Sequence, residues 1–142
     1  TLSKARSSLG MEVFKNLFYK GVERFEEEKA DFHGLVSRGF DGTVCSMPDS
    51  AENQITFKKA SNQKELHGFP LMRVMCLMNL TTRLIRDVAF APYAGKHTGE
   101  STLMMEILKG FKGGRLRSLF HFDALFYSFL LVWNIQQKGH FF

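Results

Sequence analysis

The spacing of apolar residues predicts a helix in the first part of the chain. Phe14, Leu17, Phe18, Val22 and Phe25 recur at helical intervals, so they share one face of a helix. The polar run that begins at Glu26 marks the end of this stripe. We therefore interpret residues 1–30 as a helical segment that precedes the main domain.

Three extended segments are expected next. Residues 35–47 are interpreted as a strand, and the polar stretch 48–68 as a loop. Residues 71–80 are almost all apolar, which is typical of a strand buried on both faces. Residues 83–93 form a further strand candidate, closed by Pro92. Only Thr81 and Thr82 separate the last two strands, which predicts an antiparallel hairpin.

The second half of the chain alternates between helix and strand. A helical face is formed by Leu103, Met104, Ile107, Leu108 and Phe111, before Gly113 and Gly114 end the helix. A short strand is expected over 116–122, and a last helix over 129–138, with Ser128 at its N-cap and Gly139 after it. Residues 140–142 have the character of the start of another strand.

This order of elements predicts an α/β fold. Three antiparallel strands followed by helix, strand, helix and strand match the RNase H-like arrangement, a mixed sheet flanked by helices. We expect an N-terminal helical segment over residues 1–30 and a partial RNase H-like domain over 31–142. Because the chain begins at Thr1 and ends on an apolar Phe142, we also expect both ends to be cut.

Composition restricts the class of protein further. A chain of 142 residues, 44% of them apolar, fits one folded domain. With two cysteines, a disulfide-rich scaffold and a cysteine-based zinc site are both excluded. No apolar run is long enough to cross a bilayer, so no membrane partner is expected. The net charge of +5 is compatible with a polyanionic partner but does not identify one.

One basic cluster is free of acids: Lys109, Lys112, Arg115 and Arg117. These side chains could contact nucleic-acid phosphates, and they could equally form a solvated turn. The sequence leaves both interpretations open.

Two carboxylates are candidates for a metal site. Asp41 interrupts an apolar strand and is followed by Gly42, which would leave room for a ligand to approach the backbone. Asp123 directly follows a short apolar strand. A carboxylate beside a buried strand is costly unless it is satisfied, and a divalent cation would satisfy it. In an RNase H-like sheet the two strands are neighbours, so both acids could bind Mg²⁺ together. Local roles, such as capping a turn, remain open for each.

Several short segments, in the same order, resemble the DDE transposases of the insertion-sequence-four type. The segments are 4–10, 41–43, 47–53, 88–93, 99–103 and 123–129, of which the last, Asp-Ala-Leu-Phe-Tyr-Ser-Phe, is the strongest. Together they cover almost the whole chain. For the helical segment over residues 1–30 two interpretations stay open: a helix that packs on the domain, or part of an N-terminal DNA-binding region.

The resemblance also implies an activity. Asp41 would be the first and Asp123 the second acid of a triad that binds Mg²⁺ or Mn²⁺. Such enzymes cleave DNA at transposon ends and join the freed 3′-hydroxyl to target DNA. The implied partners are transposon-end and target DNA, with two chains acting as a pair on DNA. The implied location is the bacterial cytoplasm, in association with the nucleoid.

Three departures from the family limit this expectation. The third acid should follow in a Tyr-x-x-Arg-x-x-x-Glu signature, but no Asp or Glu follows Asp123. Ala124 stands where the family often has a basic residue, and segment 35–40 is less apolar than usual. We therefore expect a fragment cut before the third acid and inactive alone. The alternative is a non-catalytic, DNA-binding remnant of a transposase.

Other polar residues have simpler explanations. Glu100 at a helix start complements the helix dipole, and Glu106 lies off the apolar stripe. His121 should share a face with Asp123, two residues later on the strand, which would suit a role supporting that acid. Cys45 and Cys76 are expected to be small core residues.

Overall fold

The computed structural model describes residue 4 and residues 8–26, 28–59 and 68–142. The resemblance segment at 4–10 therefore lies partly outside the described residues. The elements are α2 (Met11–Phe25), β1 (Val36–Ser46), α3 (Ala51–Thr56), β2 (Leu71–Asn79), β3 (Ile85–Pro92), α4 (Glu100–Gly110), β4 (Ser118–His121), the 3-10 helix η1 (Ala124–Phe126) and α5 (Phe129–Gln137).

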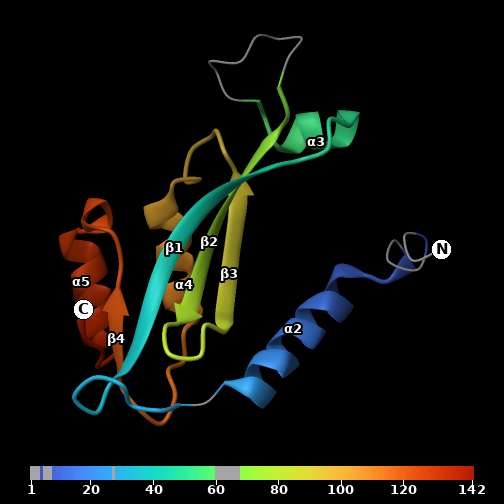
Figure 1. Ribbon diagram of the computed structural model, residues 1–142. Helices are drawn as coiled ribbons and strands as arrows, with labels where there is room; N and C mark the ends of the chain where they lie inside the picture. Colours follow the sequence, from blue (N-terminus) through green and yellow to red (C-terminus); the bar gives the residue numbers. More distant parts are fainter. Residues whose placement is uncertain (1–3, 5–7, 27, 60–67) are drawn as a thin grey trace.

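The four strands form one mixed sheet in the order β3-β2-β1-β4 (Figure 1). β1 pairs antiparallel with β2, and β2 antiparallel with β3, so the predicted hairpin is confirmed. β4 joins the other edge of β1 in parallel. Phe141 forms a parallel bridge with Leu119, where the sequence predicted a further strand. This α/β arrangement is compatible with an RNase H-like fold.

The core lies on one face of the sheet. Met75 and Leu77 of β2 and Phe40 of β1 pack against the apolar face of α4, whose Leu103, Met104, Ile107 and Leu108 are all buried. α5 adds Leu131 and Ile135 beside β4. The Ser128 hydroxyl accepts a hydrogen bond from the Leu131 amide at 3.2 Å, as expected for an N-cap.

The opposite face of the sheet is open, so the expectation that residues 71–80 are buried on both faces is wrong. Burial alternates along the second half of β2, where Met75 and Leu77 are buried while Cys76 and Met78 are only half-buried. Phe90 on β3, which pairs with Val74, is 55% exposed. A nearly continuous apolar run can thus belong to a strand with one partly solvated face.

Two short elements were not predicted. α3 lies within the stretch 48–68 that the sequence analysis assigned to a loop, and the Ser50 hydroxyl accepts from the Asn53 amide at its start. η1 follows β4 directly and is capped by Asp123.

α2 forms as expected but only its Val22 is buried, because the helix contacts little beyond β3 (Figure 1). No helix within the described ranges is long and apolar enough to span a membrane.

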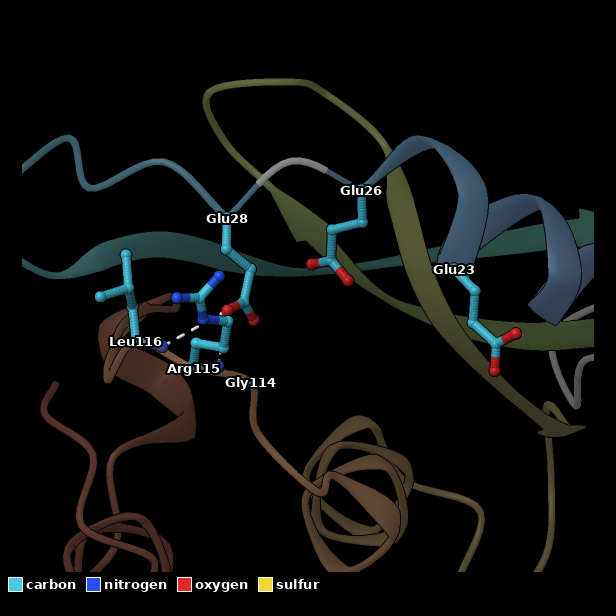
Figure 2. A pocket seen from close by; sticks show the side chains of 6 residues that line it. All are labelled: Glu23, Glu26, Glu28, Gly114, Arg115 and Leu116. Atoms are coloured by element: carbon cyan, nitrogen blue, oxygen red, sulfur yellow. Dashed lines mark hydrogen bonds between the residues drawn. The ribbon is translucent and has the colours of Figure 1, made fainter.

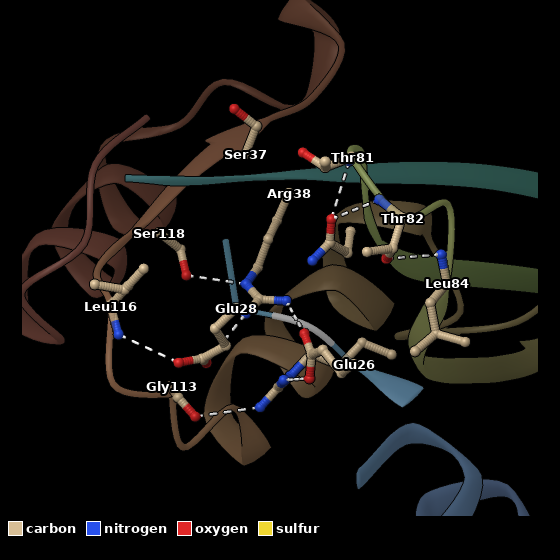
Figure 3. Close-up of polar contacts among 12 residues, drawn as sticks. Glu26, Glu28, Ser37, Arg38, Thr81, Thr82, Leu84, Gly113, Leu116 and Ser118 are labelled. Carbon is tan, nitrogen blue, oxygen red and sulfur yellow. Dashed lines mark hydrogen bonds and ion pairs between the residues drawn. The ribbon is translucent and has the colours of Figure 1, made fainter. Parts of the chain in front are cut away.

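A buried ion cluster joins β1, β3 and β4 to the segments that follow α2 and α4 (Figure 3). The Arg38 side chain on β1 is fully buried, donates from Nε to the Ser118 hydroxyl at 3.0 Å, and pairs with Glu26. Glu26 also pairs with Arg86, which donates to the Gly113 carbonyl at 3.2 Å. Both guanidinium groups stack on the Phe111 ring, 5.4 and 5.0 Å from its centroid.

Removing one partner of this cluster should be costly. We expect Arg38→Met to lower the free energy of unfolding by about 3 kcal/mol, because it leaves the Glu26 carboxylate buried with less compensation. Lys15→Met, which breaks the exposed Lys15–Glu12 pair, is the control and should cost less than about 0.5 kcal/mol. Urea denaturation measures both, and similar small losses would contradict the assigned role of the cluster.

His140 should make stability depend on pH. Its Nδ1 accepts from the Ser118 amide at 3.2 Å, and burial lowers its pKa below the ordinary 6.5, with Arg38, Lys138 and Arg117 adding to the effect. As the pH falls, His140 is therefore protonated at a higher pH in the unfolded chain than in the folded protein. Stability should be full above about pH 6.5 and fall as the pH drops from there toward the lowered folded pKa.

Urea denaturation at a series of pH values between 7.5 and 5.5 tests this effect. The loss is up to about 1.4 kcal/mol for each unit by which the pKa is lowered. His140→Asn keeps an acceptor for the Ser118 amide but cannot titrate, so its stability should fall less over this range. Identical pH profiles for both proteins would contradict the prediction.

Candidate active site

The register of the parallel strands brings Asp41 and Asp123 to the same level of the sheet. Gly39 of β1 lies opposite His121 of β4, and each acid is two residues further along its own chain. Both acids line one shallow cavity of about 310 Å³. Its other lining residues are Gly39, Phe40, Met78, Leu80, His121 and Phe122.

Asp41 lies on the open face of the sheet and is exposed. Its neighbour across the β1–β2 pairing is Cys76. Burial raises the pKa of the Cys76 thiol, and the negative charge of Asp41 adds to the rise. Because Asp41 and Asp123 are both exposed, the expected cost of a buried carboxylate does not arise at either residue.

Asp123 has a local role as well as a place in the cavity. Its Oδ1 accepts a hydrogen bond from the Leu125 amide at 2.9 Å and so caps η1. This is the turn-capping interpretation that the sequence left open. The cap orients the carboxylate at the end of β4, so the two roles are compatible.

Gly42 leaves room for a side chain of the same protein and not, as its position had suggested, for a ligand. The space beside it is filled by Glu100 of α4, whose carboxyl carbon would lie 3.1 Å from a Cβ at this position. Glu100 also pairs with Arg73 at 3.2 Å, and Arg73 stacks on Tyr93. Alternation along β1 places Gly42 and Asp41 on opposite faces. Glu100 is therefore separated from the cavity by the sheet.

The chemistry of the cavity suits a hard cation but is incomplete. Two exposed carboxylates offer the oxygen donors that Mg²⁺ and Mn²⁺ prefer, with the remaining positions left to water or phosphate oxygens. Within the described part of the chain, no group of three or more potential ligands could hold a metal ion. His121 lines the same cavity as Asp123. Cys45 and Cys76 are free thiols and half-buried.

The basic cluster lies away from the acids. Lys109, Lys112, Arg115 and Arg117 are exposed at the end of α4 and in the loop before β4. Arg117 stacks on the Phe141 ring at 5.2 Å. Arg117 and Asp123 sit at opposite ends of β4, roughly 20 Å apart at about 3.3 Å per residue. The cluster does not line the cavity that holds the two acids.

Arg38 and Glu28 have a structural role that their place in the sequence does not indicate. Arg38 contributed to the low apolarity of segment 35–40, which counted as a departure from the family. In the structure its charge is matched by Glu26, with Glu28 3.6 Å away. The signal was the run of three glutamates at 26–28, although the sequence does not reveal which strand they meet.

Two curated proteins are similar to this chain, and both are named as transposases. InsZ of Escherichia coli is 29% identical over 144 residues, covering 97% of this chain and 46% of InsZ. InsG of Escherichia coli, a transposase for an insertion sequence element, is 25% identical over 114 residues, covering 72% of this chain and 26% of InsG. The chain thus spans less than half the length of either protein. No family model and no solved structure matches the chain.

The contact between Gly42 and Glu100 can be tested by adding one methyl group. Gly42→Ala should lower the free energy of unfolding by about 1 kcal/mol, since the Glu100 side chain must move and its pair with Arg73 loosens. Gly110→Ala is the matched control, because it lies in α4 with open space around it and should be neutral or stabilising. Thermal unfolding of both variants measures the difference. A Gly42→Ala protein as stable as the wild type would refute the contact between Gly42 and Glu100.

Proposed function

We propose that this chain is part of a metal-dependent DNA transposase with an RNase H-like, DDE-type catalytic domain. Asp41 and Asp123 are its first two acids and hold Mg²⁺ or Mn²⁺. The observation that carries the proposal is the common cavity of the two acids, on neighbouring parallel strands. The similarity to two proteins named transposases supports the transposase part of the proposal.

The proposed reaction has two steps on DNA. In the first, a water oxygen bonds to phosphorus at a transposon end and the bond to the 3′ oxygen breaks, which leaves a 3′-hydroxyl. In the second, this hydroxyl attacks a target phosphodiester and displaces the target's 3′ oxygen. Metal ions bound by the acids would activate the attacking oxygen and stabilise the leaving oxygen.

The chain alone should not complete this reaction. Two carboxylates are fewer ligands than a site with two metal ions requires. No acid follows Asp123, and Glu100 lies on the other face of the sheet. We infer a fragment that needs a third acid from elsewhere. Its partners are transposon-end and target DNA, bound by a pair of chains with the basic cluster contacting phosphates, in the bacterial cytoplasm near the nucleoid.

The second candidate is a DNA-binding remnant without catalysis. The observation that favours it is the lack of a three-ligand group among the described residues. The two candidates agree on DNA as partner and differ on metal binding. Metal binding at Asp41 and Asp123 therefore distinguishes them.

Manganese titration followed by electron paramagnetic resonance tests the acid pair. The wild-type chain should bind Mn²⁺ weakly, and Asp41→Asn or Asp123→Asn should weaken binding by about ten-fold or more, because each removes one of two charged ligands. Asp49→Asn is the control. It makes the same charge change at a carboxylate that pairs with Lys59 and Gln54, so binding should not change.

Two outcomes would overturn parts of this proposal. Equal Mn²⁺ binding by the wild-type and the variants at Asp41 and Asp123, together with retained binding of duplex DNA, would favour the remnant. Specific cleavage or strand transfer at transposon ends by the chain alone, seen on a gel with Mg²⁺ or Mn²⁺, would contradict its inferred inactivity.

A further inference from the structure

The loop between α4 and β4 contacts the Glu28 carboxylate through its backbone (Figure 2). Glu28 Oε2 accepts hydrogen bonds from the backbone amides of Arg115, at 2.6 Å, and Leu116, at 3.3 Å. Successive amides that converge on one oxygen form a backbone nest, which is a general anion-binding geometry. We call these two amides and Gly114 the loop nest.

The glycines of the loop fit this interpretation. Gly113 adopts a positive φ of 72°, which a side chain rarely tolerates. A Cβ at Gly114 would overlap the Glu28 carboxylate, so a side chain there would displace Glu28 from the amides. The absence of a side chain at Gly114 thus lets an anion lie against the backbone.

The charges around the loop nest are not balanced by Glu28. Within the described ranges, no carboxylate lies within ion-pair distance of Lys112, Arg115 or Arg117. Glu26 is already engaged by Arg38 and Arg86 (Figure 3). A cavity of about 650 Å³, lined in part by Glu28 and Arg115, adjoins the nest and leaves room for a larger anion.

We propose that the loop nest is a binding site for a DNA backbone phosphate, and that Glu28 occupies it as an intramolecular competitor. This inference rests on the proposed function, which supplies DNA as the partner. A phosphate oxygen accepts the same amide hydrogen bonds as a carboxylate oxygen, and the exposed cations around the loop favour it over bulk water. Glu28 then has to leave before the phosphate binds.

The position of the nest suits a duplex that also reaches the acids. The nest precedes β4 and the acid pair follows it, roughly 25 Å away at about 3.3 Å per residue. Since a duplex advances about 3.4 Å per base pair, this separation corresponds to roughly seven base pairs. A DNA backbone presented to Asp41 and Asp123 could thus meet the nest about two-thirds of a helical turn away.

Glu28 and Glu23 provide a matched pair of variants. Both line the same cavity, and replacing either by Ala removes the same charge and the same atoms. Glu28 differs from Glu23 in holding the amides and in lying 3.6 Å from the buried Arg38, so the stability of Glu28→Ala is measured alongside its DNA binding. Fluorescence anisotropy with a short duplex should show about ten-fold tighter binding for Glu28→Ala, the gain expected if the nest is free about a tenth of the time. Glu23→Ala should stay within about two-fold of wild type.

Two further variants test whether the gain comes from freeing the loop nest and not from removing the negative charge of Glu28. Glu28→Asp keeps the charge but is one methylene shorter, so it should also bind DNA more tightly. Gly114→Ala places a methyl group in the nest and should remove the gain when combined with Glu28→Ala. Circular dichroism confirms that each variant is folded.

Inorganic phosphate, followed by the amide resonances of Arg115 and Leu116, tests the nest without DNA. Phosphate should shift these resonances at lower concentration in Glu28→Ala than in Glu23→Ala. Phosphate binding without DNA binding would retain the nest and reject the proposed function. DNA binding that is equal in all variants, without selective phosphate shifts, would reject the nest and leave the proposed function standing.

Discussion

The buried charge of Arg38 constrains how the rest of the structure fits together. A guanidinium with no exposed surface needs compensating groups around it, and here they come from three separate parts of the chain. Glu26 arrives from the segment after α2, Ser118 from β4, and the Phe111 ring from the end of α4. Each of these segments is held in place by satisfying the same charge.

The constraint reaches the acid pair through strand register. The hydrogen bond from Arg38 to the first residue of β4 helps to fix where β4 lies against β1. Two strands that slide by one residue would turn one acid to the opposite face, since side chains alternate. Asp41 and Asp123 share a cavity because the buried ion cluster holds the β1–β4 pairing near the start of β4.

The sequence predicted the elements better than the purpose of individual residues. Periodicity located the strands and main helices, and the short connection at Thr81 and Thr82 located the hairpin. It missed α3, because the cap formed by Ser50 is a local signal inside a polar stretch. Gly42 suggested access for a ligand and Arg38 suggested a weak strand. Both were misjudged because Glu100 and Glu26, which explain them, are distant in sequence or lie on another element.

The parallel pairing of β1 with β4 also bears on how the chain folds. β2 and β3 are joined by a short turn and close a small loop, whereas Arg38 and Ser118 are 80 residues apart. The hairpin can therefore form early, while β1 carries a charge that is stable in the interior only once β4 and the glutamates have arrived. We expect a late, cooperative step in which the parallel edge closes, and a transition state that is richest in hairpin contacts.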